Sequence, residues 1–143
     1  MTAHYKTFTH LLYQTAHAWR LAVDRHLKHS GLSMSSWMAI GLIASETRPL
    51  TQTELAQLLG LEDASMVPLI DRLVKQGLLS RVQPPEDRRK RLLLLTEKGN
   101  QAFSVVKTEA DALRADLLDG IDPQALVTTE KVLQQLLARM GNM

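Results

Sequence analysis

Residues 50–96 restrict how this chain can fold more than any other stretch, because capping residues, glycines and prolines stand at nearly every end of the predicted helices and strands. A capping box spans Thr51 to Glu54, where the two end residues satisfy each other's backbone N–H groups at a helix start. Gly60 follows the apolar residues of that helix and suits a left-handed C-terminal position. A second helix is predicted from Asp63 to Gln76 on its apolar stripe. Two short helices joined by a tight turn predict a helix-turn-helix.

A basic hairpin is predicted directly after these helices. Residues 79–83 and 91–95 read as strands, and the segment from Pro84 to Lys90 cannot continue either of them because proline donates no ladder hydrogen bond. Four consecutive basic residues, 88–91, lie at the hairpin tip. A charge run is usually a solvated surface, but after a helix-turn-helix it is better explained as a second DNA contact, a wing. The sequence therefore predicts a winged helix-turn-helix over 33–99, in a mainly α fold with a small β hairpin.

Amphipathic helices are predicted on both sides of this core. An N-terminal helix over about 5–29 carries a broad apolar face, which needs a cover. A scaffold helix from Met34 to about Ser45 follows it, and two further helices follow the hairpin, one capped by Thr96 and one restarted at Asp122-Pro123. The apolar faces indicate either dimerisation helices (5–32 and 100–143) or ordinary core packing. We expect one domain over 1–143.

Composition excludes several classes of protein. With 45% apolar residues in a chain of 143, disorder is not expected. There is no cysteine, so disulfides and thiol chemistry are excluded. The start lacks a signal-peptide pattern and no apolar run reaches the roughly 18 residues of a membrane span, so we expect a cytoplasmic protein. The sequence contains no phosphate loop, nucleophile elbow or metalloprotease motif, so neither an enzyme nor a cofactor is expected.

The net charge of +2 says little about nucleic acid, but its distribution says more. Counting Lys and Arg against Asp and Glu, residues 1–49 carry five against two, residues 50–95 seven against six, and residues 96–143 five against seven. The C-terminal part is therefore not the part expected to face DNA.

From Gly31 to Gly99 the chain resembles the MarR family of transcriptional regulators. The matching pieces are LTQTELA from Leu50, LIDRL from Leu69, GLLSR from Gly77, EDRRKR from Glu86 and LLTEKG from Leu94. The resemblance implies a homodimer that binds operator DNA, and often a small-molecule or oxidant effector. It implies a sequence-specific regulator, expected to be a repressor, acting on a pseudo-palindromic operator.

The predicted DNA contacts lie on the two helices and the wing. A recognition helix contacts the edges of DNA bases with side chains near its N-terminal end, and basic residues on flanking elements hold phosphates. Arg72 is the main candidate on that helix, Ser65 either contacts DNA or caps the helix, and Arg81 either holds a phosphate or pairs with Asp71. The full predicted set is Thr51, Ser65, Pro68, Leu69, Arg72, Arg81, Arg88, Arg89, Lys90 and Arg91.

Pro68 departs from the polar or basic residue that many relatives carry at this position. Proline removes a helical hydrogen bond, so the helix either begins nearer Ser65 or bends at Val67. The surrounding pattern resembles the branch that senses organic hydroperoxides through cysteine, which this chain lacks. We therefore expect few direct contacts between this helix and base edges. Recognition of DNA shape, together with the wing, is expected to carry more of the specificity. In the wing, the family's Asp-x-Arg pattern implies that Arg89 enters the minor groove and that Asp87 either orients Arg89 or braces the hairpin.

An effector pocket is predicted between the dimer helices and the reading head, because family members commonly hold small aromatic acids or lipophiles there. Its candidate lining is Tyr13, His17, Arg20 and Trp37, with ordinary core or interface packing as the alternative. Two other functions stay open. A metal-responsive regulator would use the N-terminal histidines His4, His10, His17, His26 and His29. A winged-helix protein-interaction module would bind without regard to DNA sequence, and the basic wing argues against it.

Overall fold

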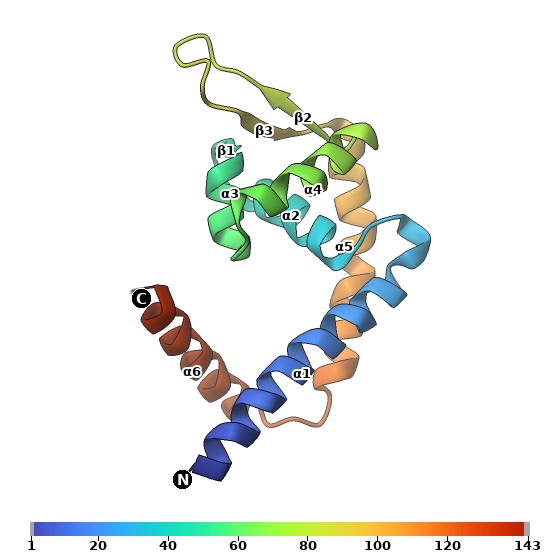
Figure 1. Cartoon of the computed structure of the whole chain (residues 1–143). Helices are drawn as coiled ribbons and strands as arrows, with labels where there is room; N and C mark the ends of the chain where they lie inside the picture. The colour runs from blue at the N-terminus through green and yellow to red at the C-terminus, as the bar shows by residue number, and fades with distance from the viewer. Residues whose placement is uncertain (1, 142–143) are drawn as a thin grey trace. The chain divides into compact units, whose positions relative to one another are not determined.

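The computed structural model describes residues 2–141, with side chains from Tyr5 onward. Its elements are α1 (Thr2–His26), a 3-10 turn (Lys28–Ser30), α2 (Met34–Ser45), β1 (Leu50–Thr51), α3 (Gln52–Leu59), α4 (Asp63–Lys75), β2 (Leu79–Val82), β3 (Leu92–Leu95), α5 (Glu97–Leu118) and α6 (Pro123–Gly141) (Figure 1). The mainly α fold with a small hairpin is confirmed. The chain divides into two compact units, residues 1–111 and residues 112–143.

Side-chain caps begin the helices where the sequence predicts them. The Ser33 hydroxyl accepts from the Ser36 N–H at 3.1 Å and caps α2. The Thr96 hydroxyl accepts from the Gly99 N–H at 3.0 Å and caps α5. Gly60 ends α3 with φ of 70°, a left-handed conformation that glycine adopts without steric cost. Local sequence signals therefore set most helix boundaries.

The reading head (residues 32–96) has a continuous apolar core. Helices α2, α3 and α4 contact one another, and α2 and α4 also contact the strands (Figure 1). The largest fully buried side chains of the head are Ile40, Leu55, Met66, Ile70, Leu73, Leu79 and Leu93. Because these come from all its helices and from both strands of the hairpin, the recognition helix and the hairpin are held by one core.

The sheet has three strands, in the order β1-β3-β2, rather than the two expected. Strands β2 and β3 form the predicted antiparallel hairpin, each one residue shorter than predicted. Strand β1 pairs with β3 through Leu50 to Leu93 and Thr51 to Leu92. At two residues, β1 is too short to show the alternation by which strands are predicted. This pairing brings the start of α3 to the end of the wing.

The start of α5 lies tightly against the turn between α4 and β2. A Cβ at Gly99 would stand 2.2 Å from the Leu78 carbonyl oxygen, closer than any side chain can approach. The Thr96 N–H donates to the same carbonyl at 3.1 Å. Glycine at position 99 therefore permits the close approach that joins α5 to the reading head.

The N-terminal helix differs from its predicted bounds of about 5–29. It starts at Thr2 and ends at His26, and the next residues form a separate 3-10 turn. The Ser30 hydroxyl donates to the Leu27 carbonyl at 2.6 Å, and Gly31 follows with φ of 76°. Leu27 is fully buried, so the chain is anchored in the core where it turns toward α2.

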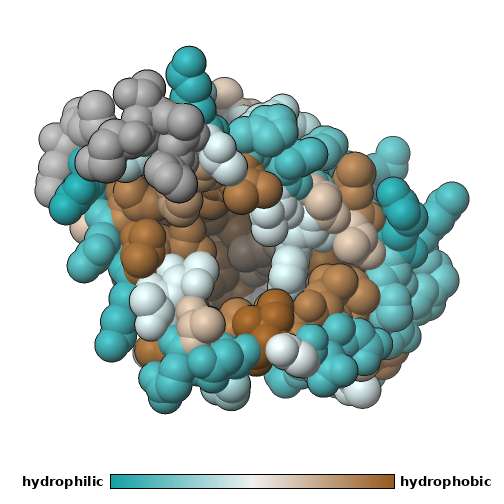
Figure 2. Space-filling model, turned by 90° about the horizontal axis from the view of Figure 1, so that it is seen from below, coloured by the Kyte–Doolittle hydropathy of each residue, from teal (hydrophilic) through white to brown (hydrophobic). Residues whose placement is uncertain are grey.

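The outer helices keep apolar side chains on their surfaces. Every described residue of α6 is exposed or half-buried. Brown apolar surface stands among teal polar surface on the face drawn in Figure 2. The exposed large apolar residues are Tyr5, Phe8, Leu11, Leu12, Tyr13 and Leu21 on α1, and Val127, Val132, Leu133, Leu137 and Met140 on α6. In the described part of the chain, every helix is too short or too polar to cross a membrane.

Candidate nucleic-acid interface

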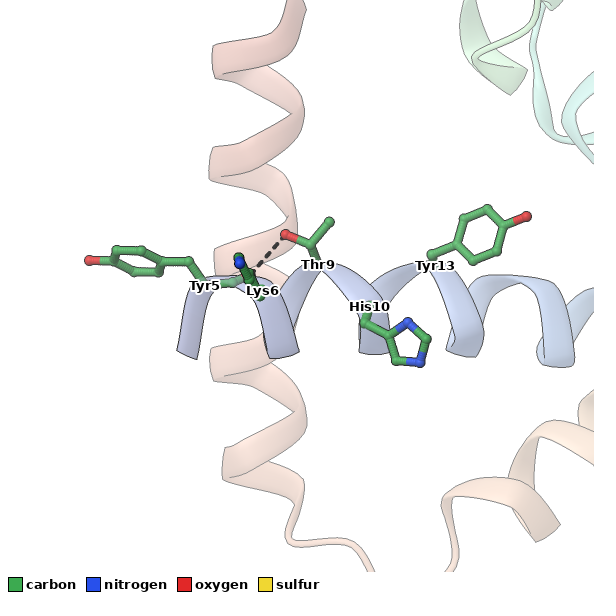
Figure 3. A pocket seen from close by; sticks show the side chains of 5 residues that line it. All are labelled: Tyr5, Lys6, Thr9, His10 and Tyr13. Carbon is green, nitrogen blue, oxygen red and sulfur yellow. Dashed lines mark hydrogen bonds between the residues drawn. The ribbon is translucent and has the colours of Figure 1, made fainter. Parts of the chain in front are cut away.

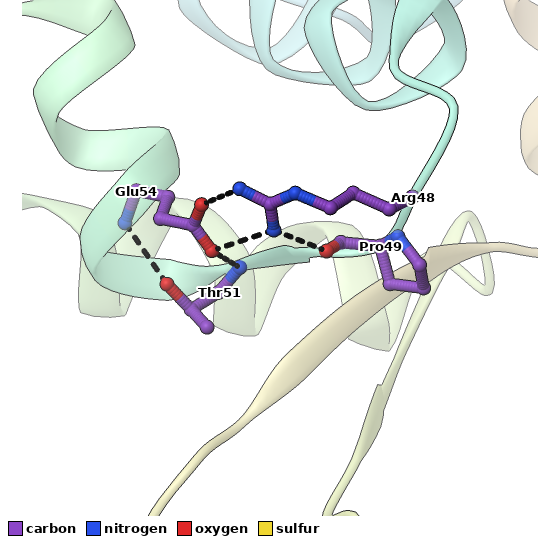
Figure 4. A network of polar contacts seen from close by, with 4 residues as sticks. All are labelled: Arg48, Pro49, Thr51 and Glu54. Carbon is purple, nitrogen blue, oxygen red and sulfur yellow. Dashed lines mark hydrogen bonds and ion pairs between the residues drawn. The ribbon is translucent and has the colours of Figure 1, made fainter.

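The start of α3 is fixed by a four-residue polar network (Figure 4). Thr51 and Glu54 complete the predicted capping box, with both hydrogen bonds at 3.1 Å. Arg48 holds the same carboxylate from outside, one guanidinium nitrogen donating to Glu54 Oε1 at 3.2 Å and the other to Oε2. The Arg48 hydrogen bond, and then the Thr51 N–H, lower the pKa of Glu54 from 4.5 to about 2. Glu54 is therefore ionised but paired.

The recognition helix α4 buries one face and exposes the other. Met66, Leu69, Ile70 and Leu73 are buried, whereas Ser65, Pro68 and Arg72 are exposed. The prediction that Leu69 contacts DNA is wrong, because this side chain is only 4% exposed and lies in the core of the head. Its spacing of three from Met66 and four from Leu73 sets it on the apolar stripe.

The boundaries of α4 decide where the helix starts. The helix begins at Asp63, with Glu62 at the N-cap and no side-chain cap bond there. Ser65 therefore lies inside the helix and does not cap it. The helix begins before Pro68 and continues through it to Lys75, so Pro68 does not shorten the helix. Since Pro68 has no N–H, the Ala64 carbonyl one turn earlier lacks its helical donor.

Arg81 on β2 forms an ion pair with Asp71 on α4. The Arg81 side chain is 25% exposed, so this pair lies partly within the head. Of the two roles predicted for Arg81, the structure has the pairing with Asp71. The pair joins the recognition helix to the first strand of the wing.

The wing is a turn whose basic side chains are exposed to solvent. The Asp87 N–H donates to the Pro84 carbonyl at 3.2 Å, and the Lys90 N–H donates to the Asp87 carbonyl at 3.3 Å. The Asp87 carboxylate accepts from the Arg89 backbone N–H at 3.0 Å and from Arg89 Nε at 3.2 Å. The Arg89 side-chain bond is the largest cause that lowers the pKa of Asp87. Through these contacts Asp87 holds the Arg89 side chain, which is 93% exposed.

A cavity of about 320 Å³ lies between the start of α3 and the returning arm of the wing. Its lining is Thr51, Gln52, Thr53, Arg89, Lys90 and Arg91. Sequence reasoning missed Gln52 and Thr53, because only the pairing of β1 with β3 brings them to the wing. No local signal in the sequence marks that pairing.

The residues predicted to line an effector pocket lie on two helices. On α1, the rings of Tyr13 and His17 stack with centroids 6.4 Å apart. On α2, Trp37 stacks on Phe103 of α5 with centroids 6.1 Å apart. A hollow of about 570 Å³ on α1 is lined by Tyr13 but by none of the other three predicted residues (Figure 3). Tyr5, His10 and Tyr13 point in different directions around it (Figure 3).

One of the histidines considered for a metal site is paired with a carboxylate. His29 Nε2 lies 2.8 Å from Glu109 Oε2 on α5, which gives it a protein partner. The His4 side chain lies outside the described residues. Among the residues that are described, no three His, Asp or Glu side chains stand close enough together to hold a metal ion.

Comparison with known proteins identifies the family. A model of the MarR family matches residues 30–90, which run from the 3-10 turn to the wing. The solved structure of transcriptional regulator PA3341 is similar over 95% of this chain and 99% of that one, with 38% identity and a TM-score of 0.84. A MarR-family regulator from Rhodococcus sp. RHA1 is similar over 92% of each chain, with 26% identity and a TM-score of 0.82.

Two further structures were solved with a bound partner. CouR from Rhodococcus jostii RHA1, bound to p-coumaroyl-CoA, is similar over 88% of each chain, with 28% identity and a TM-score of 0.80. MepR from S. aureus, in complex with DNA, matches 93% of this chain and 96% of that one at 17% identity, which shows the shared fold alone (TM-score 0.82). With the family model on the reading head and 38% identity across nearly the whole chain, this protein belongs to the MarR family of transcriptional regulators, which are non-enzymatic DNA-binding proteins.

Proposed function

We propose that this MarR-family regulator acts in the cytoplasm as a homodimer that binds a pseudo-palindromic operator and represses transcription. One observation carries the proposal: α4 and the wing belong to one compact head, and each presents exposed basic side chains. A helix of this kind enters the major groove, and a basic loop beside it reaches the adjacent minor groove. The shared fold with MepR, solved on DNA, supports this use of the head.

The exposed residues divide the work of binding. Ser65, Pro68 and Arg72 face outward from α4, and Arg72 is the one among these three that can make a charged contact. Pro68 offers no hydrogen-bonding group, so base readout from α4 is limited. Arg89, oriented by Asp87, reads the width of an A·T-rich minor groove. Arg88, Lys90 and Arg91 hold phosphates, and Thr51, whose hydroxyl accepts the cap bond, has its own hydrogen to donate.

Dimerisation is supported by the surfaces of α1 and α6. Each helix exposes five or more large apolar side chains, although soluble monomers rarely expose such faces. A second copy of the chain can cover them, because a twofold interface presents the same patch from both partners. Two heads related by this twofold would read half-sites about 34–36 Å apart, one turn of B-DNA.

A small organic effector is proposed to change the spacing of the two heads. The indole nitrogen of Trp37 is buried with no hydrogen-bond partner among the described residues. A buried donor without an acceptor costs about 1–3 kcal/mol, which an effector oxygen would recover. CouR, solved with p-coumaroyl-CoA, supports a compound that carries an aromatic acyl group as the effector. Tyr13, His17 and Arg20 on α1 remain its further candidate contacts.

Selection of bound duplexes from a random pool tests this function. The expected result is an inverted repeat whose half-sites are centred about 10–10.5 base pairs apart, bound by two chains. The double variant Arg72→Ala/Arg89→Ala serves as the control and should enrich no sequence. A wild-type protein that sediments as a single chain and enriches no duplex contradicts the proposal.

A further inference from the structure

The C-terminal end of α4 is closed by groups from the start of α5. Lys98 Nζ donates to the Gln76 carbonyl at 2.9 Å, and the Thr96 hydroxyl donates to the Gly77 carbonyl at 2.6 Å. The Thr96 N–H donates to the Leu78 carbonyl at 3.1 Å. Three successive carbonyls after α4 therefore bond to the segment that begins α5. The Lys98 ammonium also lies at the negative end of the α4 dipole, where a cation is favoured.

The same end of α4 is tied to the turn that follows α1. Gln76 Nε2 donates to the Gly31 carbonyl at 3.3 Å. This turn is also held to α5, because His29 Nε2 lies 2.8 Å from Glu109 Oε2. The turn, the end of α4 and α5 are thus joined in a closed ring of polar contacts. Gln76 takes part in the ring twice, through its carbonyl and through its side-chain amide.

Both chain connections of the reading head lie at this end of α4. The head begins one residue after Gly31 and ends at Thr96, and both residues contact the segment that closes α4 (Figure 1). Ser65 and Pro68 lie toward the other end of the helix. At 1.5 Å per residue, α4 is about 20 Å long, so a tilt of about 10° at its C-terminal end moves its other end by roughly 3 Å. That displacement is close to the rise of one base pair, about 3.4 Å.

We propose that Gln76 and Lys98 are positioning residues: they fix the tilt of α4 relative to α1 and α5, and thereby set the half-site spacing that two paired heads accept. Neither side chain touches DNA in this role. The inference rests on the proposed function and goes beyond it, because it assigns the selectivity for spacing to contacts at the far end of the recognition helix.

Operators whose half-sites stand one base pair closer or farther apart than the selected spacing test this role. Dissociation constants of the full-length protein are measured by fluorescence anisotropy. The spacing ratio is the constant on a shifted operator divided by the constant on the selected one. For wild type we expect a ratio on the order of ten, because one base pair turns a half-site by about 35° as well as moving it.

Lys98→Met and Gln76→Ala each remove one contact of the ring. Each should lower the spacing ratio by about threefold, the effect of one lost hydrogen bond. Lys98→Arg keeps a cationic donor and should retain the wild-type ratio. Lys107→Met is the matched control, because it removes the same charge from α5 at a position that pairs with Asp111. It should leave the ratio unchanged.

The spacing ratio separates positioning from a general loss of stability. A variant that is merely less stable weakens binding to every operator by the same factor, so an unchanged ratio in Lys98→Met and Gln76→Ala overturns the positioning role. An equal fall in Lys107→Met also overturns it, since loss of charge would then suffice. If Lys98→Met does not fold, Gln76→Ala decides alone, because its side chain is only half-buried. A wild-type ratio close to one overturns the proposed function, and the positioning role with it.

Discussion

The reading head and helix α6 use similar apolar residues in opposite ways. In the head, Ile70 and Leu73 of α4 are fully buried, and they join a core to which the other helices and the hairpin strands contribute. On α6, Leu137 is 67% exposed and Met140 is 55% exposed. The head buries its apolar side chains, whereas α6 leaves them exposed. We infer that the head is stabilised within one chain and that pairing of chains depends on the outer helices.

The largest expected effect comes from the core of the head. Ile70→Ala removes a fully buried side chain and should lower the free energy of unfolding by about 2–5 kcal/mol, measured by urea denaturation. Leu58→Ala, at a position 52% exposed on α3, is the control and should change it by about 0.5 kcal/mol or less. Equal costs at the two positions would break the comparison, since burial would not then distinguish them.

A charge on α6 should act on association rather than on the fold of the head. Leu137→Asp buries a carboxylate in the proposed interface and should weaken dimerisation roughly 10- to 100-fold in sedimentation equilibrium. Gln135→Asp adds the same charge on another side of the helix and should leave the dimer intact. If Leu137→Asp sediments as wild type does, α6 lies outside the interface.

Within the head, the wing should act on DNA binding. Arg89→Ala should weaken operator binding by about tenfold and flatten discrimination at A·T-rich flanks, as it removes the side chain proposed for the minor groove. The slope of log affinity against log salt should fall by about one unit. Lys107→Gln, on α5 outside the head, is the control for loss of one positive charge. If Arg89→Ala binds the operator as tightly as wild type does at physiological salt, the wing is not part of the interface.

The smallest expected effect is pH-dependent and concerns the start of α3. Glu54→Gln should lower the free energy of unfolding at pH 7 by about 1 kcal/mol, because it weakens the capping box. The pKa of Glu54 is depressed to about 2, so its contribution is full above the ordinary pKa of 4.5 and is lost as pH falls toward 2. The difference between wild type and variant should therefore shrink across that window. Glu62→Gln, which removes a carboxylate at an N-cap without a side-chain bond, is the charge-matched control.

Much of the head could be predicted because its signals are local. The capping box at Thr51, the glycine after α3 and the prolines of the wing each act within a few residues, and the structure has a helix start, a helix end and a turn at those places. The mainly α fold and the family follow from the order of such signals along the chain.

What could not be predicted depends on contacts between residues far apart in the sequence. Strand β1 exists through its pairing with β3, and the whole helix-turn-helix and the wing lie between the two strands along the chain. Gln52 and Thr53 meet the wing for the same reason. Leu69 shows a different error, since the prediction assigns it to the outward face of α4 although its helical spacing from Met66 and Leu73 sets it in the core.

Operator spacing tests most directly the central claim that two heads read DNA as a twofold pair. About five base pairs inserted between the selected half-sites turn one half-site by half a helical turn relative to the other. The account predicts that affinity, measured by anisotropy, falls to that of a single half-site. An affinity unchanged by the insertion would contradict it, since each head would then bind without reference to its partner.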